Sequence, residues 1–324
     1  MERERARVVV AGASGFVGRA LLPLLAARFH VVALSRGAPE ATPPAHVEWR
    51  ACDLFSLRDT ERALAGADYG VYLVHSMMPS ARLTQASFAD VDLVLADNFA
   101  RAAQRAGLRQ IVYLGGLAAE DEALSQHLES RLEVERTLAS RGVPLTAVRA
   151  GLVIGAGGSS FQLLERLVRR LPVMLCPAWT ATRTQPVALA DVAELLAGTV
   201  GDASCAGAVL EAGGPEVMTY RAMMQRTAAL LGKRRPMLPV PFFSPGLSRL
   251  WVSLVTQAPR ALVAPLIQSL RHTMVASRDD LAARLGRSGA GFDDAVRAAL
   301  AEQAASPAAR RDATRRAFAG ERRR

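Results

Sequence analysis

The sequence predicts an α/β protein: a doubly wound parallel sheet followed by a smaller, partly helical C-terminal region. Short apolar segments alternate with helical patterns through the first 150 residues, as in sheets whose strands are buried on both faces. A glycine-rich turn joins the first apolar segment to the first helical one. Half of the 324 residues are hydrophobic, which is enough to bury a sizeable core.

Six apolar segments of the first half are expected to form strands. Five are short, apolar and bounded by turn residues, which is typical of buried strands, and residues 47–50 fit this pattern less well. A later segment is expected to return to the same sheet. The expected strands are residues 7–11, 30–34, 47–50, 69–74, 111–114, 145–149 and 208–211.

Helices are predicted from apolar residues at helical spacing and from residues that favour helix ends. Ser56 and Asp59 form a capping pair at the start of one helix, and Thr219 caps another. Gly107 and Gly142 stop two helices, because glycine readily adopts the left-handed conformation found just past a helix end. The expected helices are residues 15–28, 56–64, 86–106, 128–141, 160–170, 191–200 and 219–232.

A glycine-rich turn, residues 12–18, lies between the first strand and the first helix. In this context, three spaced glycines bind the pyrophosphate of a dinucleotide at a helix N-terminus. The sequence therefore predicts a Rossmann-type domain that binds a dinucleotide, and the alternative is a tight turn without a ligand. The expected cofactor contacts here are Gly12, Ser14, Gly15, Phe16, Val17 and Gly18.

The end of the second strand indicates which dinucleotide is bound. An NAD-preferring domain carries an acidic residue there, whereas this chain has Ser35 and Arg36. An arginine suits the 2′-phosphate of NADP(H), so the sequence favours NADP(H) over NAD(H). The alternative for Arg36 is an ordinary surface role. After the third strand, Asp53 and Leu54 fit either a contact with the adenine edge or a helix-entry turn.

These features resemble the short-chain dehydrogenase/reductase superfamily, in its extended and atypical branches, over about residues 6–275. The glycine turn, CDL (52–54), VYL (112–114) and ALADVA (188–193) match that layout. Within the superfamily, the chain is most similar to the NAD(P)H-binding group near the NmrA-like proteins. The segments that carry this second likeness are YLVHSM (72–77), LGGL (114–117), LPVM (171–174), RTQP (183–186) and LSRLW (247–251).

The superfamily's usual mechanism needs residues that this chain lacks. A tyrosine exchanges the proton, a lysine four residues later lowers the tyrosine pKa, and a serine orients the carbonyl. None of the four tyrosines here has a lysine four residues on, and Lys233 is the only lysine. The resemblance places His127 at the tyrosine position and Arg131 at the lysine position. Gly115 or Gly116 stands at the serine position.

His127 and Arg131 are therefore the candidate catalytic residues. His127 is expected to titrate near neutral pH and to act as a general acid. Arg131 is expected to bind ribose hydroxyls and to hold positive charge near the nicotinamide. The alternatives are structural: His127 as a helix-entry residue, and Arg131 as a surface ion-pair partner of Glu135.

Further cofactor contacts are expected at the carboxyl ends of the strands, which face the ligand crevice in such sheets. Val74 and His75 follow the fourth strand, and Gly115 ends the fifth. Ala150 leaves the sixth strand in a segment that the resemblance places beside the nicotinamide. The alternative for His75 is to stabilise its loop. Residues 157–160 predict either a second anion site or a helix cap.

The expected function is that of an NADPH-dependent oxidoreductase acting on an unidentified small apolar molecule. The alternative is a non-catalytic NADP(H)-binding redox sensor or assembly protein with a protein partner, which the loss of the usual Tyr-Lys pair favours. Seven apolar side chains are expected to line a substrate pocket or to belong to the core. They are Phe161, Leu164, Met174, Trp179, Phe242, Phe243 and Trp251.

The dinucleotide-binding domain is expected to comprise residues 1–150 and about 184–212. Residues 151–183 and 213–300 are expected to form a substrate or lid region. Residues 301–324 hold seven arginines and are expected to be a solvated or disordered tail. The net charge is +10, but half of the excess lies in residues 307–324, which hold seven arginines and two acidic residues, so we do not expect nucleic-acid binding.

A cytoplasmic protein is expected. No signal peptide is predicted, and no uncharged apolar run approaches the ~20 residues that a spanning helix needs. Contact of residues 242–270 and the arginine-rich tail with anionic lipid is a third hypothesis, which the lack of a clean amphipathic pattern disfavours. The cysteines at positions 52, 176 and 205 lie far apart, so we expect reduced thiols and no metal site.

Overall fold

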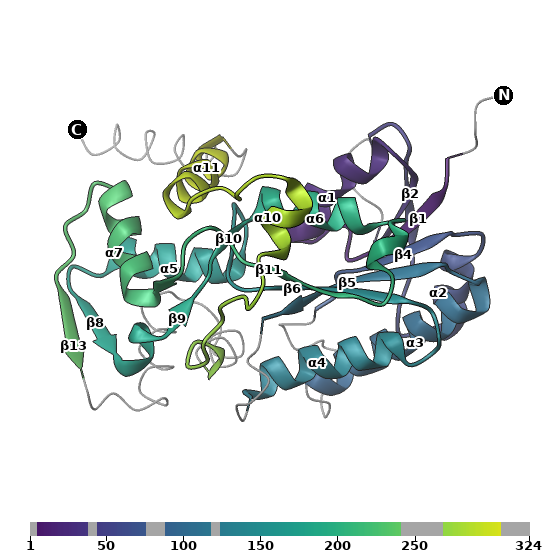
Figure 1. Cartoon of the computed structure of the whole chain (residues 1–324), viewed down its shortest axis with the longest axis horizontal. Coiled ribbons are helices and arrows are strands. Elements are labelled where there is room, and N and C mark those ends of the chain that lie inside the picture. The colour runs from purple at the N-terminus through teal and green to yellow at the C-terminus, as the bar shows by residue number, and fades with distance from the viewer. Residues whose placement is uncertain (1–4, 38–43, 76–87, 118–123, 241–267, 306–324) are drawn as a thin grey trace, which may run out of the picture.

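The computed structural model describes residues 5–37, 44–75, 88–117, 124–240 and 268–305 (Figure 1). A central sheet is formed by β1 (Arg7–Ala11), β2 (His30–Ser35), β3 (Val47–Ala51), β4 (Tyr69–Tyr72), β5 (Gln110–Gly116), β6 (Leu145–Ala150) and β11 (Val209–Ala212). The strands lie in the order β11-β6-β5-β4-β1-β2-β3, and all neighbours are parallel. The predicted doubly wound sheet is confirmed, including its returning last strand.

Helices cover both faces of this sheet, as Figure 1 shows. On one face, α1 (Phe16–Ala26) packs against α6 (Leu189–Thr199). On the other face, α3 (Phe88–Ala106) packs between α2 (Leu57–Leu64) and α4 (Gln126–Ala139). Ser56 and Ser125 cap α2 and α4 by accepting hydrogen bonds from the backbone N–H groups of Asp59 and Leu128.

The strands are apolar on both sides because each side faces a layer of helices. Val8 and Val10 of β1 join the core with α1 and α6, whereas Val9 and Ala11 join the core with α2, α3 and α4. All four residues are fully buried. Continuous apolar runs, rather than alternating ones, are therefore what this sheet requires.

A second group of elements packs around its own core beyond the carboxyl edge of the sheet, on the left in Figure 1. Its helices are α5 (Ser159–Arg170), α7 (Tyr220–Leu230) and α11 (Phe292–Ala305), and Thr219 caps α7 as predicted. Three short strand pairs accompany them. They are β7 (Val153–Ile154) with β10 (Val187–Ala188), β9 (Arg183–Thr184) with β12 (Met218–Thr219), and β8 (Met174–Pro177) with β13 (Met237–Val240).

The segment before α11 returns to the large sheet. Within it, α10 (Asp280–Leu285) packs against α6 and β11. Asp280 accepts a hydrogen bond from the backbone N–H of Glu211 at 2.9 Å, and the Glu211 carboxylate accepts from the backbone N–H of Ser277. Asp191, 2% exposed in α6, accepts from Arg287 at 2.8 Å and from the backbone N–H of Ala290 at 2.7 Å. The C-terminal segment is thereby fixed to both elements.

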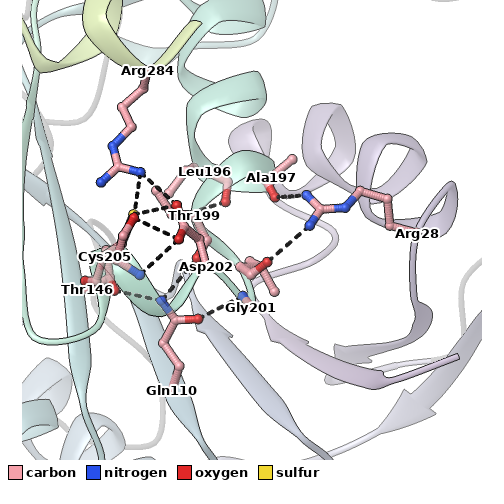
Figure 2. A network of polar contacts seen from close by, with 12 residues as sticks. Arg28, Gln110, Thr146, Leu196, Ala197, Thr199, Gly201, Asp202, Cys205 and Arg284 are labelled. Atoms are coloured by element: carbon pink, nitrogen blue, oxygen red, sulfur yellow. Dashed lines mark hydrogen bonds and ion pairs between the residues drawn. The ribbon is translucent and has the colours of Figure 1, made fainter.

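A buried polar network fixes the end of α6 at the opposite, amino edge of the sheet (Figure 2). The amide of Gln110 donates to the Thr146 hydroxyl at 2.7 Å and to the Thr199 carbonyl at 3.0 Å. Its oxygen accepts from the backbone N–H of Gly201 at 2.8 Å. Because every bond here joins separate elements, the network is a structural tie far from the glycine turn.

Several expectations concern residues outside the described ranges: Ser76 and Met77, the LSRLW segment, the expected membrane-contact segment from residue 242 to 267, and the tail beyond residue 305. α11 continues to Ala305, so the described helix includes the first five residues assigned to the tail. The short pairs β7–β10, β9–β12 and β8–β13, and helices α10 and α11, were not predicted. Among the described residues, no helix has the length and apolar character that crossing a membrane requires.

Candidate functional site

The glycine-rich turn connects β1 to α1 at the carboxyl edge of the sheet. Gly12 has a φ of 84°, and a Cβ atom there would lie 2.9 Å from the carbonyl carbon of Leu73. A Cβ atom on Gly18 would lie 2.4 Å from the carbonyl oxygen of Gly12. These approaches demand glycine, and they bring the start of α1 close to both β1 and the end of β4.

The N-terminus of α1 has no side-chain cap. Gly15 is its N-cap residue, and the first turn carries no acidic side chain. Ser14 and Gly15 are exposed, and Val17 is half-buried. Uncapped N–H groups at a helix N-terminus attract anions, which is the property that the predicted pyrophosphate contact requires.

Phe16 packs the glycine turn against the second group of elements. A Cβ atom on Gly158 would lie 2.9 Å from the Phe16 ring, and one on Gly155 would lie 3.0 Å from it. The missing side chains of Gly155 and Gly158 therefore make room for the ring. This contact lies beside the N-terminus of α5, where Gly158 is the N-cap residue. A contact between Phe16 and the cofactor stays a prediction.

The ends of β2 and β3 hold the residues predicted to bind the adenosine half of the cofactor. Arg36 is exposed and follows β2 directly. The Asp53 carboxylate accepts the backbone N–H of Phe55 at 3.2 Å, and Asn98 of α3 donates to the Leu54 carbonyl at 2.9 Å. The 53–55 turn is thus tied to α3 and enters α2. Its adenine contact stays a prediction.

His75 lies just past β4 and pairs with a buried carboxylate. Its Nδ1 is 2.8 Å from Oδ2 of Asp92 in α3, and the Asp92 side chain is 2% exposed. Burial and the positive charge of Arg131 lower the pKa of His75, against the raising effect of Asp92. The Nε2 atom is buried and has no hydrogen-bond partner among the described residues. Val74, which precedes it, packs against the core between the sheet and α3.

His127 lies in the first turn of α4, beside His75. The two imidazole ring centres are 5.0 Å apart. Burial, followed by the proximity of His75 and Arg131, lowers the pKa of His127 to about 3. The expectation that His127 titrates near neutral pH is therefore wrong, because a desolvated imidazole next to a cation favours its neutral form.

Arg131 follows one helical turn later and is held in place from two sides. Its Nη2 donates to the Leu114 carbonyl at 2.9 Å, and its own carbonyl accepts the Tyr113 hydroxyl at 3.1 Å. Nη1 is buried, with no partner in the described part of the chain. Glu135 pairs instead with Arg149 at 2.8 Å, so the alternative of an Arg131–Glu135 surface pair is wrong.

The two glycines at the expected serine position differ in the space around them. A Cβ atom on Gly115 would lie 3.1 Å from the Tyr113 ring, whereas one on Gly116 would meet only the Leu128 side chain, at 3.5 Å. Ala150 ends β6 and is 5% exposed, with its carbonyl accepting the backbone N–H of Leu117. The proposed cofactor contacts of Gly115 and Ala150 stay predictions.

The comparisons with known proteins agree with this geometry. Residues 12–202 match a family model described as NAD(P)H-binding, which covers more than half of the chain. The chain belongs to the NAD(P)H-binding family. The resemblance to atypical short-chain dehydrogenase/reductase proteins is likewise confirmed by the family model and by the solved structures with this fold.

The chain matches less than half the length of each of two curated relatives. The Auxiliary protein GraX of Staphylococcus aureus (strain NCTC 8325 / PS 47) is 27% identical over 121 residues, which span 37% of this chain and 39% of GraX. The Uncharacterized protein Rv2047c of Mycobacterium tuberculosis (strain ATCC 25618 / H37Rv) is 30% identical over 236 residues. That match spans 72% of this chain and 24% of the relative.

Three solved structures illustrate the shared fold. Triphenylmethane reductase of Citrobacter sp., complexed with NADP(H), has a TM-score of 0.73 at 17% identity and covers 91% of this chain and 100% of its own. The Escherichia coli NADPH-dependent quinone oxidoreductase QOR2, complexed with NADPH, has a TM-score of 0.70 at 17% identity, and the match covers 90% of this chain and 98% of QOR2. UDP-glucose 4-epimerase of Thermus thermophilus, complexed with NAD, has a TM-score of 0.67 at 21% identity, and the match covers 93% of this chain and 99% of the epimerase. At these identities the likeness shows the fold alone.

The described residues fit a nicotinamide dinucleotide. Gly12 and Gly18 leave room that a Cβ atom would fill, and the uncapped start of α1 offers N–H donors to a pyrophosphate. Farther along the same edge, the buried Nη1 of Arg131 lacks an acceptor among these residues, which a hydroxyl or carbonyl of the cofactor or substrate would supply. Within the described ranges, no group of three or more His, Cys, Asp or Glu side chains is arranged to hold a metal ion.

Asp92 is the site residue that the sequence reasoning missed. A signal for it exists, because Asp92 precedes Ala96 and Phe99 by four and seven residues and therefore shares the buried face of α3. A carboxylate on an apolar helix face calls for a polar partner. Which partner it finds depends on how α3 lies against the end of β4, and a helical pattern does not contain that information.

The expected pocket residues divide into core and unassigned positions. Phe161 and Met174 are fully buried, and Leu164 is 6% exposed, all within the core of the second group of elements. Trp179 packs on Tyr220, with ring centres 6.2 Å apart, and its indole N–H is buried with no partner among the described residues. Phe242, Phe243 and Trp251 lie outside those residues.

Proposed function

We propose that this protein is an NADPH-dependent oxidoreductase that acts on a small apolar molecule. One observation supports the proposal above the others: the glycine turn and the His75–His127–Arg131 group meet at the same edge of the sheet. Ala11 of β1 pairs with Tyr72 of β4, and Tyr72 pairs with Tyr113 of β5, so β1 and β4 end level and β5 continues to Gly116 at the same edge. A cofactor bound at the turn would therefore extend toward the histidines and arginine.

The preference for NADP(H) rests on Arg36 at the end of β2. A guanidinium there would form charge-assisted hydrogen bonds with a 2′-phosphate. The acidic residue that an NAD-preferring domain carries at this position is not found in Ser35 or Arg36. Two of the structural neighbours are complexed with NADP(H) or NADPH, and a third with NAD. The fold therefore accommodates either cofactor, and Arg36 carries the proposed choice.

The chain's own side chains would take over what the missing tyrosine and lysine do. The nicotinamide ring supplies or accepts the hydride when the cofactor is bound. Arg131, fixed by the Leu114 carbonyl, would bind a ribose hydroxyl or the substrate oxygen through Nη1. The neutral imidazole of His127 would donate a hydrogen bond that polarises a substrate carbonyl, as neutral histidines do elsewhere.

A first experiment tests binding and turnover together. The purified protein is titrated calorimetrically with NADPH, NADP⁺, NADH and NAD⁺, and NADPH oxidation is followed with a panel of carbonyl, quinone and imine compounds. We expect tighter binding of the phosphorylated pair and steady oxidation with at least one compound. Failure of all four nucleotides to bind would reject the cofactor site, and binding without any turnover would reject the enzyme.

A second candidate function is a non-catalytic NADP(H)-binding redox sensor or assembly protein. The observation in its favour is that the low pKa of His127 leaves no protonated acid at the position of the usual tyrosine. The name of one relative, an auxiliary protein, points in the same direction. This function predicts unequal affinity for oxidised and reduced cofactor, a protein partner, and no turnover with the panel.

A further inference from the structure

Three buried polar atoms near the ends of β4 and β5 have no hydrogen-bond partner in the described part of the chain. They are the Tyr72 hydroxyl, Nε2 of His75 and Nη1 of Arg131. Buried polar groups are almost always paired in folded proteins, so unpaired ones indicate a missing ligand or water. The Asp92 carboxylate acts on two of these groups: its Oδ2 lies 2.8 Å from Nδ1 of His75, and its charge raises the pKa of both Tyr72 and His75.

Asp92 determines which nitrogen of His75 carries the proton. An ionised carboxylate only accepts hydrogen bonds, and its Oδ2 lies 2.8 Å from Nδ1. Nδ1 of the neutral ring is therefore the N–H donor. The lone pair is left on Nε2, the atom that lacks a partner among the described residues.

The charged and titratable groups described around His75 come mainly from two helices. Asp92 of α3 contacts the ring directly, while His127 and Arg131 approach from α4. Burial and Arg131 together lower the pKa of His75, which favours the neutral ring, and the Nε2 of a neutral ring that is protonated on Nδ1 can accept a proton. Arg131 presents a donor, Nη1, and His75 presents an acceptor, which is the pair that a hydroxyl group requires.

We propose that His75, oriented by Asp92, is the proton-transfer residue of this site, and that Arg131 donates to the same substrate oxygen. The proposal rests on the proposed oxidoreductase function. In the oxidising direction, a substrate hydroxyl gives its proton to Nε2 while its carbon gives a hydride to the nicotinamide of NADP⁺, and the alcohol becomes a carbonyl. In reduction by NADPH, the imidazolium returns the proton to the oxygen.

The geometry favours His75 over His127, the residue at the usual tyrosine position. His75 has a carboxylate that fixes its ring and its tautomer, as catalytic histidines commonly do. The contact of His127 in the described structure is with the His75 ring, and no carboxylate of that part holds it. The proton-transfer group would thus have moved from α4 to the end of β4.

The tautomer of His75 is the first test, because it needs no substrate. Long-range ¹⁵N–¹H spectra of the full-length protein saturated with NADPH would contain signals from five histidines, and His75→Gln assigns the relevant one. We expect a neutral ring protonated on Nδ1, and a measurable fraction of the Nε2–H form in Asp92→Asn. A His75 protonated on Nε2 in the unmodified protein would overturn the proposal.

Turnover of a panel compound is the second test. We expect His75→Gln to lower kcat at least 100-fold and to weaken NADPH binding far less than that. Asp92→Asn should lower kcat about 10-fold or more and move the acid limb of alcohol oxidation to lower pH, because the carboxylate no longer stabilises the imidazolium. The matched control is His30→Gln, which removes a histidine lying 3.7 Å from Glu48 at the other edge of the sheet.

The outcomes separate this proposal from the proposed function. Wild-type kcat in His75→Gln would mean that Nε2 holds a buried water only, and would overturn the proposal while leaving the enzyme intact. Loss of turnover in His127→Gln alone would reassign the proton transfer to His127. If the unmodified protein turns over nothing, the proposed function fails, and the tautomer alone supports or overturns the Asp92–His75 pair.

Discussion

At the scale of single residues, cofactor choice depends on the side chain that follows β2. Arg36→Asp should weaken NADPH binding about 10- to 100-fold and NADH binding little, because it replaces charge-assisted hydrogen bonds to the 2′-phosphate with repulsion. Calorimetry with both nucleotides measures this. Arg166→Asp, an equal change of charge on the exposed face of α5, is the control. Equal losses for NADPH and NADH would refute the role of Arg36.

The glycine turn offers a sharper test at the same scale. A Cβ atom on Gly18 would lie 2.4 Å from the Gly12 carbonyl oxygen and 2.6 Å from that of Ala13. Both are backbone atoms, which cannot move aside without a large cost in free energy. Gly18→Ala should therefore cost about 1–3 kcal/mol of unfolding free energy and lower NADPH affinity at least 10-fold. Urea denaturation and calorimetry provide the two measurements.

The matched control is the same substitution at Gly198, inside α6. This glycine is exposed, and a Cβ atom would meet nothing within 4 Å among the described residues. Gly198→Ala should stabilise the protein by about 0.5–1 kcal/mol, because alanine loses less backbone entropy in a helix. Unchanged cofactor binding is expected. A Gly18→Ala variant as stable and as tightly binding as this control would show that the turn tolerates a side chain.

At the scale of elements, α6 holds the returning C-terminal segment through one buried carboxylate. Asp191→Ala should cost about 1.5–3 kcal/mol, since charged hydrogen bonds to Arg287 and to the Ala290 N–H are lost. Hydrogen exchange at Ala290 should accelerate. Glu194→Ala removes an exposed partner of the same arginine and should cost less than about 1 kcal/mol. Equal costs would mean that Asp191 acts only as a surface charge.

The elements also differ in how far the sequence predicts them. Strands such as β1 and β5 are apolar on both faces, and caps such as Ser56 and Thr219 bond to N–H groups three residues away, so local patterns contain the information. The pairs β7–β10 and β9–β12 are two residues long and have no period to detect. Their existence depends on tertiary packing.

The candidate site shows the same division. The glycine turn is readable because a strand, three glycines and a helix are contiguous in the chain. The Asp92–His75 contact joins residues from different elements, 17 positions apart, and arises only when α3 lies on the sheet. The low pKa of His127 likewise comes from neighbours and burial, which a sequence position does not specify.

At the scale of the whole molecule, a buried neutral histidine links stability to pH. The pKa of His127 is about 3 in the folded protein and about 6.5 when unfolded, so below pH 6.5 the unfolded state binds more protons. Stability should then fall as the pH drops from 6.5 toward 3, by up to about 1.4 kcal/mol per pH unit from this group. Urea denaturation between pH 7.5 and 4.5 measures the slope.

The comparison with His127→Gln isolates this contribution from that of the carboxylates. The variant keeps every other titrating group, so its stability should fall less steeply with acid than that of the unmodified protein. Parallel slopes would indicate that His127 titrates normally in the folded state. Because only the slopes are compared, a constant loss of packing in the variant does not affect the result.

The position of β11 also has a consequence for the protein as it is being made. β6 ends at Ala150, and the strand that covers its open edge ends only at Ala212, about 60 residues later. At ribosomal rates of about 5–20 residues per second, synthesis of these residues takes roughly 3–12 s, and β6 has no β11 to pair with during that time. An uncovered strand edge recruits other chains, so the nascent polypeptide is most prone to aggregate in this interval.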